Sequence, residues 1–380
     1  EAGCRTGTYT SPAVITVLER LQVDGAWITE REFAALAGQV KAAAERMEER
    51  GRGKPTVFEI ETAMAFLYFK EKGCDIVVLE TGLGGEQDAT NVVEHTLAAV
   101  FTSISMDHMG MLGNTLGEIA ACKAGIMKPG CQVVSAPQAP EVVRVLKERA
   151  AQMGCSFAQV DGGCLDAGTK QRQDRPRSYP GENVFSYKGM KGIRISLPGT
   201  YQMENGALAL ETALALTKKG IAISESDIRR GLSNVSWPGR FQMIKASPAV
   251  IVDGAHNRDA ALRLRECVQT CLKGKRLIFI MGVFMDKEYA LIVQTMAPLA
   301  EQIYTVWLPD RSRSLPPEVL AEEAGKYCGR TQAADSVGTA LDMALEQAGR
   351  EGVVLAFGSL SYLGQVMEEA ERRRRDDRQE

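Results

Sequence analysis

A carboxylate, an imidazole and a lysine occur within a short part of this chain, close to apolar segments that read as strands. Residues 76–79 are apolar and end at Glu80, which is followed by Thr-Gly-Leu-Gly-Gly. A second apolar stretch, 98–104, precedes His108, and Lys123 lies further along. In open α/β sheets, ligands bind beyond the carboxyl ends of the strands. We therefore expect a buried strand to carry Glu80 to that edge, where a hard cation and phosphate oxygens would suit it.

The glycine-rich turn alone leaves open an ordinary strand-to-loop connection that happens to begin with Glu80. The next segments favour a site, because they predict adjacent strand ends that present Glu80 and His108 together, with Lys123 on the connecting helix. An unmodified ammonium repels a cation, whereas a lysine carbamylated by carbon dioxide is an anion with two oxygen atoms. A carbamylated Lys123 would therefore fit such a site.

The elements that position these residues alternate between strand and helix. Thr115 and Glu118 have the spacing of a capping box, which predicts the start of a helix, and Gly125 is placed to end it. The same spacing at Thr56 and Glu59 predicts an earlier helix. This alternation indicates an α/β fold with a parallel sheet and right-handed crossovers.

Periodicity also predicts the secondary structure of the middle of the chain. The expected elements are a helix at 141–153, a strand at 155–160, an exposed polar loop at 161–182, a hairpin at 184–197 and a helix beginning at Asn205.

Proline and glycine mark a domain boundary near Trp237, and a fresh strand-helix series follows it. We expect strands at 250–252, 277–281, 303–308 and 353–357. The predicted domains are 1–237, 238–368 and a charged tail, 369–380. The tail reads as a frayed, solvated helix end, since acidic residues flank its run of arginines.

Composition excludes several classes of protein. The chain has 380 residues, long enough for two domains at roughly 100–200 residues each. Its 45 basic and 48 acidic residues give a net charge of −3, which does not favour nucleic-acid or membrane-surface binding. No uninterrupted run of about 18 apolar residues predicts a membrane span. Its nine cysteines include no Cys-x-x-Cys pair, so reduced thiols are favoured over disulfides or a zinc site.

Seven motifs in order carry a resemblance that covers nearly the whole chain. They begin at Tyr9 (Tyr-Thr-Ser-Pro), Glu80 (Glu-Thr-Gly-Leu-Gly-Gly, then Asp-Ala-Thr-Asn at 88–91), Asp107 (Asp-His), Lys123 (Lys-Ala-Gly-Ile-Met-Lys-Pro-Gly), Trp237 (Trp-Pro-Gly-Arg-Phe), Asp253 (Asp-Gly-Ala-His-Asn) and Phe357 (Phe-Gly-Ser-Leu). The set resembles the folylpolyglutamate synthase family, which is often bifunctional with dihydrofolate synthase and belongs to the Mur ligase superfamily.

The resemblance implies a central parallel-sheet ATPase domain followed by a smaller Rossmann-like domain. It implies a ligase that uses ATP and Mg²⁺ to join L-glutamate to a folate through an acyl phosphate, and it leaves open whether dihydropteroate is also a substrate. The implied partners are these small molecules, with no nucleic acid and no membrane. A cytoplasmic monomer is expected.

The resemblance also implies roles for residues of the first domain. Ser11 and Glu80 would hold one Mg²⁺, and His108 with carbamylated Lys123 would hold or flank a second. Asn205 would contact adenine, although a helix cap is an equally open interpretation of Asn205.

For the second domain the resemblance implies contacts to phosphate. Arg240 would reach the γ-phosphate, with an interdomain salt bridge as the alternative. Asp253 and His256 would face the nucleotide and the acyl phosphate, and His256 would stabilise phosphate or move a proton.

The sequence departs from the family at several positions. Ala13 stands where relatives have His, Cys122 replaces a Glu, and Arg258 replaces a Pro. Val17 and Leu18 replace a Phe-Asn pair. The changes at Ala13, Val17 and Leu18 lie in the loop near the implied folate site and bear on which pterin is the substrate. Cys122 would change how Lys123 is held, and Arg258 would alter the turn more than the chemistry.

The P-loop pattern Gly-x-x-x-x-Gly-Lys-Ser/Thr does not occur in the 380 residues. We expect a sequence truncated before Glu1, whose residues alone turn over poorly. Alternatives are another Mur-type amide ligase and an inactive scaffold that lost ATP binding. A nicotinamide oxidoreductase is disfavoured, because Gly82-Leu-Gly-Gly does not complete the dinucleotide pattern.

Overall fold

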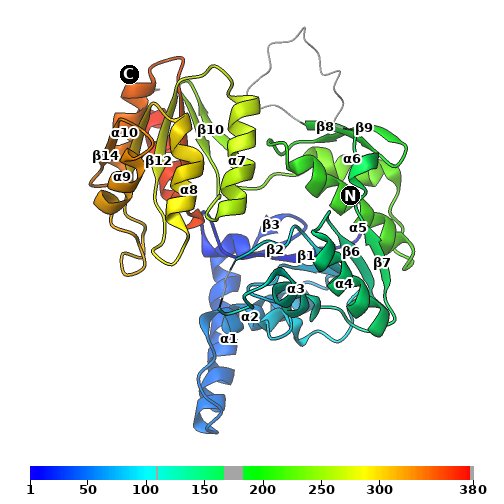
Figure 1. Ribbon diagram of the computed structural model, residues 1–380. Helices are drawn as coiled ribbons and strands as arrows, with labels where there is room; N and C mark the ends of the chain where they lie inside the picture. The colour runs from blue at the N-terminus through cyan, green and yellow to red at the C-terminus, as the bar shows by residue number, and fades with distance from the viewer. Residues whose placement is uncertain (108–109, 167–182, 377–380) are drawn as a thin grey trace. The chain divides into compact units, whose positions relative to one another are not determined.

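The computed structural model describes residues 1–107, 110–166 and 183–376, which fold into two compact units (Figure 1). The first unit is Glu1–Gly163 with Asn205–Gly231, and the second is Cys164–Glu204 with Leu232–Glu380. The α/β fold expected from the sequence is confirmed. The functional boundary near residue 237 stays a prediction, and His108 lies outside the described residues.

One sheet of the first unit is built around strand β1, in the order β3-β2-β1-β4. The strands are β1 (Thr6–Tyr9), β2 (Leu21–Val23), β3 (Ala26–Trp27) and β4 (Ile76–Leu79). Strands β1 and β4 are parallel, whereas β2 pairs antiparallel with β1 and with β3. Parallel pairing brings the carboxyl ends of β1 and β4 to one edge.

Two helices, α1 (Glu30–Glu49) and α2 (Val57–Glu71), pack with this sheet, and Figure 1 shows α1 as a long blue helix. Each begins with a capping box, at Thr29 for α1 and at Thr56 for α2, so the capping prediction for α2 is confirmed. The core between sheet and helices includes the fully buried Tyr9, Leu21 and Met64.

The prediction that a buried strand carries Glu80 is wrong. Strand β4 is the last strand of its sheet, and Val77 and Val78, on its two faces, are 36% and 55% exposed. The apolar sequence of β4 is typical of a strand covered on both sides. Coverage depends on neighbouring strands and helices, however, which a local pattern does not locate.

A second sheet of the first unit is parallel, in the order β5-β6-β7. It contains β5 (Ala98–Phe101), β6 (Gln132–Ser135) and β7 (Ser156–Gln159), and helices α3 (Leu116–Ala124) and α4 (Pro140–Gln152) pack on it through Ile119 and Leu146. The capping box at Thr115 is confirmed. Strands β4 and β5 do not pair, because they belong to different sheets, and consecutive strands pair only about two-thirds of the time. The predicted meeting of Glu80 and His108 stays a prediction, since His108 lies outside the described residues.

Shorter elements complete the connections. They are the 3-10 turns η1 (Val17–Arg20), η2 (Ala89–Val92) and η3 (Gly162–Cys164), the hairpin β8 (Asn183–Tyr187) and β9 (Met190–Ile195), and helices α5 (Gln202–Thr217) and α6 (Glu225–Asn234). The predicted hairpin is confirmed, and the predicted loop lies mostly at 167–182, outside the described residues.

The second unit contains the β8-β9 hairpin and a six-stranded sheet in the order β10-β11-β15-β12-β13-β14. Its strands are β10 (Gln242–Ala246), β11 (Ala249–Val252), β12 (Leu277–Met281), β13 (Gln302–Thr305), β14 (Thr331–Ala333) and β15 (Val353–Phe357). All neighbours are parallel except β10 and β11. The four predicted strands are confirmed, and the two outermost strands were not predicted.

Helices cover both faces of this sheet, as expected for a Rossmann-like domain. They are α7 (Arg258–Cys271), α8 (Tyr289–Met296), α9 (Pro317–Gly325), α10 (Val337–Ala348) and α11 (Leu363–Asp376), with 3-10 turns η4 (Ala297–Leu299) and η5 (Leu360–Tyr362) between them. Figure 1 shows α7 and α8 across the near face. Core residues such as Phe279 and Phe357, 5.2 Å apart between ring centres, fill the layer under these helices.

In the part of the tail that the structure describes, the predicted solvated helix end is confirmed, because the side chains of Arg372 and Arg375 are 64% and 73% exposed on α11. Helix α11 continues to Asp376, and Arg373 pairs with Asp342 at 2.5 Å and with Glu369 at 2.6 Å. Arg373 therefore ties the end of the helix to α10. In the described ranges, no helix is long and apolar enough to cross a membrane.

Candidate active site

The carboxyl ends of β1 and β4 bring Ser11 and Glu80 together. The strand register pairs Tyr9 with Leu79, and the Glu80 amide donates a hydrogen bond to the Tyr9 carbonyl oxygen over 2.9 Å. The backbone amide of Ser11 donates to Glu80 Oε2, also over 2.9 Å. Glu80 is exposed and Ser11 is half-buried. Two of the predicted metal ligands are thus neighbours at one edge of a sheet.

The glycine-rich turn after Glu80 packs directly on the end of helix α3, where Lys123 lies. A Cβ on Gly85 would lie 2.6 Å from the Lys123 carbonyl oxygen, so only glycine allows this approach. The Glu86 amide donates to the Cys122 carbonyl oxygen over 3.1 Å. Lys123 is half-buried in the last turn of α3. The backbone that follows Glu80 is therefore in contact with the helix end that carries Lys123.

Asp88 fixes the shape of this turn. Its carboxylate accepts hydrogen bonds from the amides of Leu83, over 2.8 Å, and Thr90, over 2.9 Å, and it is 9% exposed. The side chain of Asn91 donates to the Gly125 carbonyl oxygen over 3.1 Å. These contacts hold the segment after Glu80 in one conformation against α3.

The donors at this edge fit Mg²⁺. Within the described ranges no group of three or more His, Cys, Asp and Glu side chains gathers as a metal site, and His108 lies outside them. Mg²⁺ is commonly held by one or two protein oxygens and completed by water and substrate phosphates. The Ser11 hydroxyl and the Glu80 carboxylate are donors of that kind.

In the second unit, Asp253 joins the turn at Arg240 to the end of strand β11. The Asp253 carboxylate is 4% exposed and accepts hydrogen bonds from the amides of Phe241 and Ala255, each over 2.9 Å, and from the Tyr201 hydroxyl over 3.2 Å. Burial raises the pKa of the Asp253 carboxyl, and attraction to the Arg240 guanidinium opposes that shift. Asp253 therefore holds two turns in place, a contact role that its predicted catalytic role did not include.

Arg240 and His256 both contact Gly254. A Cβ on Gly254 would collide with the Arg240 guanidinium, so this glycine allows the arginine to pack against the backbone. His256 Nδ1 lies 2.8 Å from the Gly254 carbonyl oxygen. A carbonyl oxygen only accepts, so Nδ1 carries the proton and Nε2 is the basic nitrogen of the neutral ring. Asn257 caps helix α7 through the amide of Ala260, over 2.9 Å.

The prediction that Asn205 begins a helix is wrong. Helix α5 begins at Gln202, so Asn205 lies inside its first turn with an exposed side chain. The capping interpretation of Asn205 fails for this reason. Its predicted contact with adenine stays a prediction.

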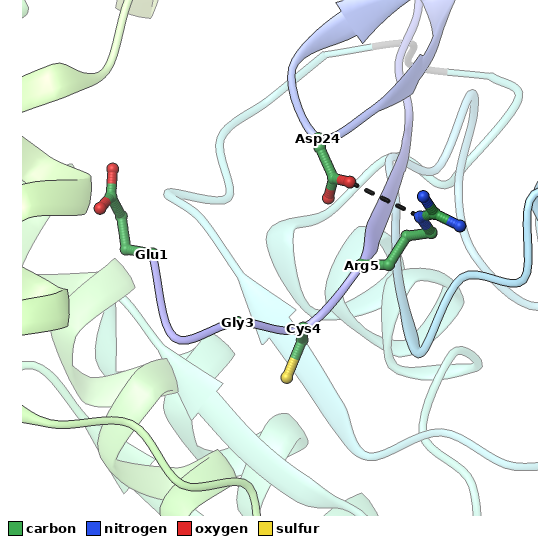
Figure 2. Close-up of a pocket in the computed structure, with 5 residues that line it drawn as sticks. All are labelled: Glu1, Gly3, Cys4, Arg5 and Asp24. Atoms are coloured by element: carbon green, nitrogen blue, oxygen red, sulfur yellow. Dashed lines mark ion pairs between the residues drawn. The ribbon is translucent and has the colours of Figure 1, made fainter.

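A hollow of about 450 Å³ lies near the start of the chain, and Figure 2 draws the residues that line it, Glu1, Gly3, Cys4, Arg5 and Asp24. The Arg5 guanidinium and the Asp24 carboxylate lie 3.8 Å apart beside it. Both residues flank the amino end of β1, opposite to the end that carries Ser11. Ligands of such sheets bind at the carboxyl ends, so this hollow does not compete with the Ser11–Glu80 edge as a site.

Comparison with known proteins matches two family domains to the chain. Residues 27–213 match the Mur ligase middle domain, and residues 239–360 match the Mur ligase glutamate ligase domain. The Bacillus subtilis dihydrofolate synthase/folylpolyglutamate synthase is 35% identical over 96% of this chain and 84% of its own length. The Escherichia coli protein of the same name is 32% identical over 98% of this chain and 82% of its own. The chain belongs to the folylpolyglutamate/dihydrofolate synthase family of Mur ligases.

Solved structures of this family agree with the fold. The Mycobacterium tuberculosis folylpolyglutamate synthase complexed with ADP superposes with a TM-score of 0.86 at 28% identity, over 97% of this chain and 84% of that one. The E. coli FolC in complex with DHPP and ADP gives 0.82 at 31% identity, over 98% and 83%. The Mur-ligase architecture predicted from the motifs is confirmed.

Sequence reasoning assigned no role to two residues near the predicted ligand Ser11, Glu19 and Arg20. Both contact the loop that carries Ser11, and Glu19 is 7% exposed. Thr16 and Glu19 have the capping-box spacing that identified other helix starts, which is the signal that could have pointed to Glu19.

Proposed function

We propose that this chain is an ATP-dependent ligase that joins L-glutamate to a folate. The observation that carries the proposal is the match to a dihydrofolate synthase/folylpolyglutamate synthase over 96% of the chain at 35% identity. Partners are small molecules, and we propose a cytoplasmic monomer. Residues 1–237 would bind ATP and the folate, residues 238–368 would serve glutamate ligation, and 369–380 would have no catalytic role.

The first step activates the folate. A carboxylate oxygen of the folate attacks the γ-phosphorus of ATP, the bond to the bridging oxygen breaks, and ADP and an acyl phosphate form. Bound Mg²⁺ would stabilise negative charge on the transferring phosphate oxygens. Ser11 and Glu80 would hold one ion, and His108 with carbamylated Lys123 would hold or flank another. The Asp88 and Gly85 contacts support this assignment, because they fix the backbone between Glu80 and helix α3.

The second step forms the amide. The glutamate nitrogen attacks the acyl carbonyl carbon, loses a proton, and phosphate leaves. Arg240 would neutralise charge on phosphate oxygens. His256 Nε2 would accept a proton or bind phosphate, since Nδ1 is directed to the Gly254 carbonyl. Asp253 would hold the turn at Arg240 and the turn at His256 in place. Asn205 would contact adenine.

Labelled glutamate tests the reaction. The protein, expressed as its gene encodes it, is given ATP, Mg²⁺ and [¹⁴C]glutamate with tetrahydrofolate, dihydropteroate or a murein precursor. We expect label in the tetrahydrofolate or dihydropteroate product, with ADP formed in equal amount, and an activity loss of at least about 100-fold in Glu80→Ala. Label only in the murein product would make the chain another Mur-type ligase. Absence of any product and of ADP would indicate an inactive scaffold.

A further inference from the structure

Two consecutive residues, Glu19 and Arg20, hold both ends of the loop that carries Ser11. At the beginning of the loop, the Thr10 amide donates to the Arg20 carbonyl oxygen over 3.0 Å, and Arg20 Nε donates to the Thr10 carbonyl oxygen over 3.2 Å. Ser11 follows Thr10 directly. The position of Ser11 is therefore tied to the backbone and the side chain of Arg20.

At the other end of the loop, the Glu19 carboxylate collects three backbone amides. Glu19 Oε1 accepts from Val14 over 2.6 Å, and Oε2 accepts from Ile15 over 3.0 Å and from Thr16 over 3.2 Å. The carboxylate is 7% exposed, so water competes little for these bonds. Hydrogen bonds to a charged group in such surroundings are stronger than those between neutral groups.

The core does not require this arrangement. Within the loop and directly after it, Ile15 is 49% exposed and Val17 is 38% exposed, so their side chains do not anchor the loop by apolar burial. A buried carboxylate instead fixes the main chain itself. The loop is therefore held by hydrogen bonds to its backbone rather than by burial of Ile15 and Val17.

Arg20 is in turn fixed to the rest of the first unit. Its guanidinium pairs with Glu61 of helix α2 and donates to the Tyr9 hydroxyl over 3.1 Å. It also lies 5.5 Å from the ring centre of Tyr9 and 5.8 Å from that of Phe58. These contacts join strand β1 and helix α2. Arg20, which holds the beginning of the loop, is therefore itself fixed to two packed elements.

We propose that Glu19 is a positioning residue: its carboxylate fixes the 11–16 loop so that the Ser11 amide meets Glu80 and the Ser11 hydroxyl stays at the metal edge. The identity of the ion rests on the proposed function. The positioning itself does not, because it concerns hydrogen bonds within the chain.

Amide hydrogen exchange, resolved by NMR, tests the positioning. We expect Glu19→Gln to speed exchange at Val14, Ile15 and Thr16, and also at Ser11, by roughly 10- to 100-fold. Glu59→Gln is the matched control, because Glu59 accepts from the Thr56 amide over 2.7 Å in the capping box of α2. It should speed exchange near Thr56 and leave Ser11 unchanged. Unchanged exchange at Ser11 in Glu19→Gln would overturn the proposal.

Broadening of the Ser11 amide signal by Mn²⁺, a paramagnetic substitute for Mg²⁺, separates positioning from general stability. The Mn²⁺ concentration for half-broadening should rise by at least about fivefold in Glu19→Gln and stay unchanged in Glu59→Gln. Faster exchange without this change would make Glu19 structural only and overturn the proposal. If Mn²⁺ does not broaden Ser11 in the wild type, the proposed metal role fails and exchange alone decides the positioning. Glu19→Asp, which keeps the charge with a shorter reach, replaces Glu19→Gln in both measurements if the latter does not fold.

Discussion

The Ser11 backbone amide lies 2.9 Å from Glu80 Oε2, so the contact between these residues uses the main chain of Ser11. Ser11→Ala removes the hydroxyl and keeps this hydrogen bond. We expect its free energy of unfolding to stay within about 0.5 kcal/mol of the wild type, while Mn²⁺ affinity falls roughly fivefold. Urea unfolding and electron paramagnetic resonance of Mn²⁺ measure the two quantities. An unchanged Mn²⁺ affinity would remove the Ser11 hydroxyl from the ligands.

The contact of Gly85 with helix α3 predicts a stability loss. Gly85→Ala places a Cβ 2.6 Å from the Lys123 carbonyl oxygen, which should lower the free energy of unfolding by about 1–3 kcal/mol. Gly38→Ala is the control, because Gly38 lies within α1 with no atom within 4 Å of the added Cβ. It should raise stability by about 0.5–1 kcal/mol. Equal effects in urea unfolding would contradict the close approach.

Substitutions of Asp253 and Tyr201 should lower the free energy of unfolding by different amounts. Asp253→Ala leaves buried donors at Phe241 and Ala255 and an unbalanced guanidinium at Arg240, so it should cost about 3–5 kcal/mol. Tyr201→Phe removes only one donor to the carboxylate and should cost about 0.5–1.5 kcal/mol. Thermal and urea unfolding of both variants give the comparison. A smaller loss in Asp253→Ala than in Tyr201→Phe would rule out the organising role of Asp253.

The pair of Glu32 and Lys72 predicts part of the acid dependence of stability. The hydrogen bond from Lys72, over 2.5 Å, together with those from the Thr29 hydroxyl and amide, lowers the pKa of Glu32 from 4.5 to about 2. A lowered pKa means that the stabilisation is complete above the unfolded pKa and is lost as pH falls from 4.5 toward 2. Because both side chains are partly exposed, the effect should stay below about 1 kcal/mol.

Between pH 5 and pH 2, the free energy of unfolding should therefore fall less in Glu32→Gln than in the wild type. The difference between the two losses should be below about 1 kcal/mol. Lys72→Met removes one partner and keeps the hydrogen bonds from Thr29, so it should give only part of this difference. A slope in Glu32→Gln equal to that of the wild type would mean that the pair contributes nothing in solution.

The sequence allowed prediction of features that local spacing decides. The capping boxes at Thr56 and Thr115 were found because donor and acceptor lie three residues apart. The four inner strands of the second unit were found because continuous apolar runs mark strands covered on both faces.

Features that depend on distant pairing were not predictable in this way. Strand β4 has the composition of an inner strand, yet its place at the end of the sheet is set by pairing with β1 alone among the described strands. The Glu19 carboxylate accepts hydrogen bonds from the backbone amides of Val14 and Ile15. Every residue type except proline has such an amide, so the sequence does not show which amides face Glu19. The start of α5 was misplaced by three residues because Asn205 is a good cap residue that lies inside the helix.

Strand β4 also has a consequence for handling the protein. Its outer edge presents backbone donors and acceptors beside Val78, which is 55% exposed, and such an edge is a template on which strands of other molecules can add. When residues 1–380 are produced by themselves, loss of solubility at high concentration should therefore start at β4 rather than at the charged helices. A positive charge at that position, as in Val78→Lys, should delay precipitation without altering the fold, because lysine on an edge strand opposes strand addition.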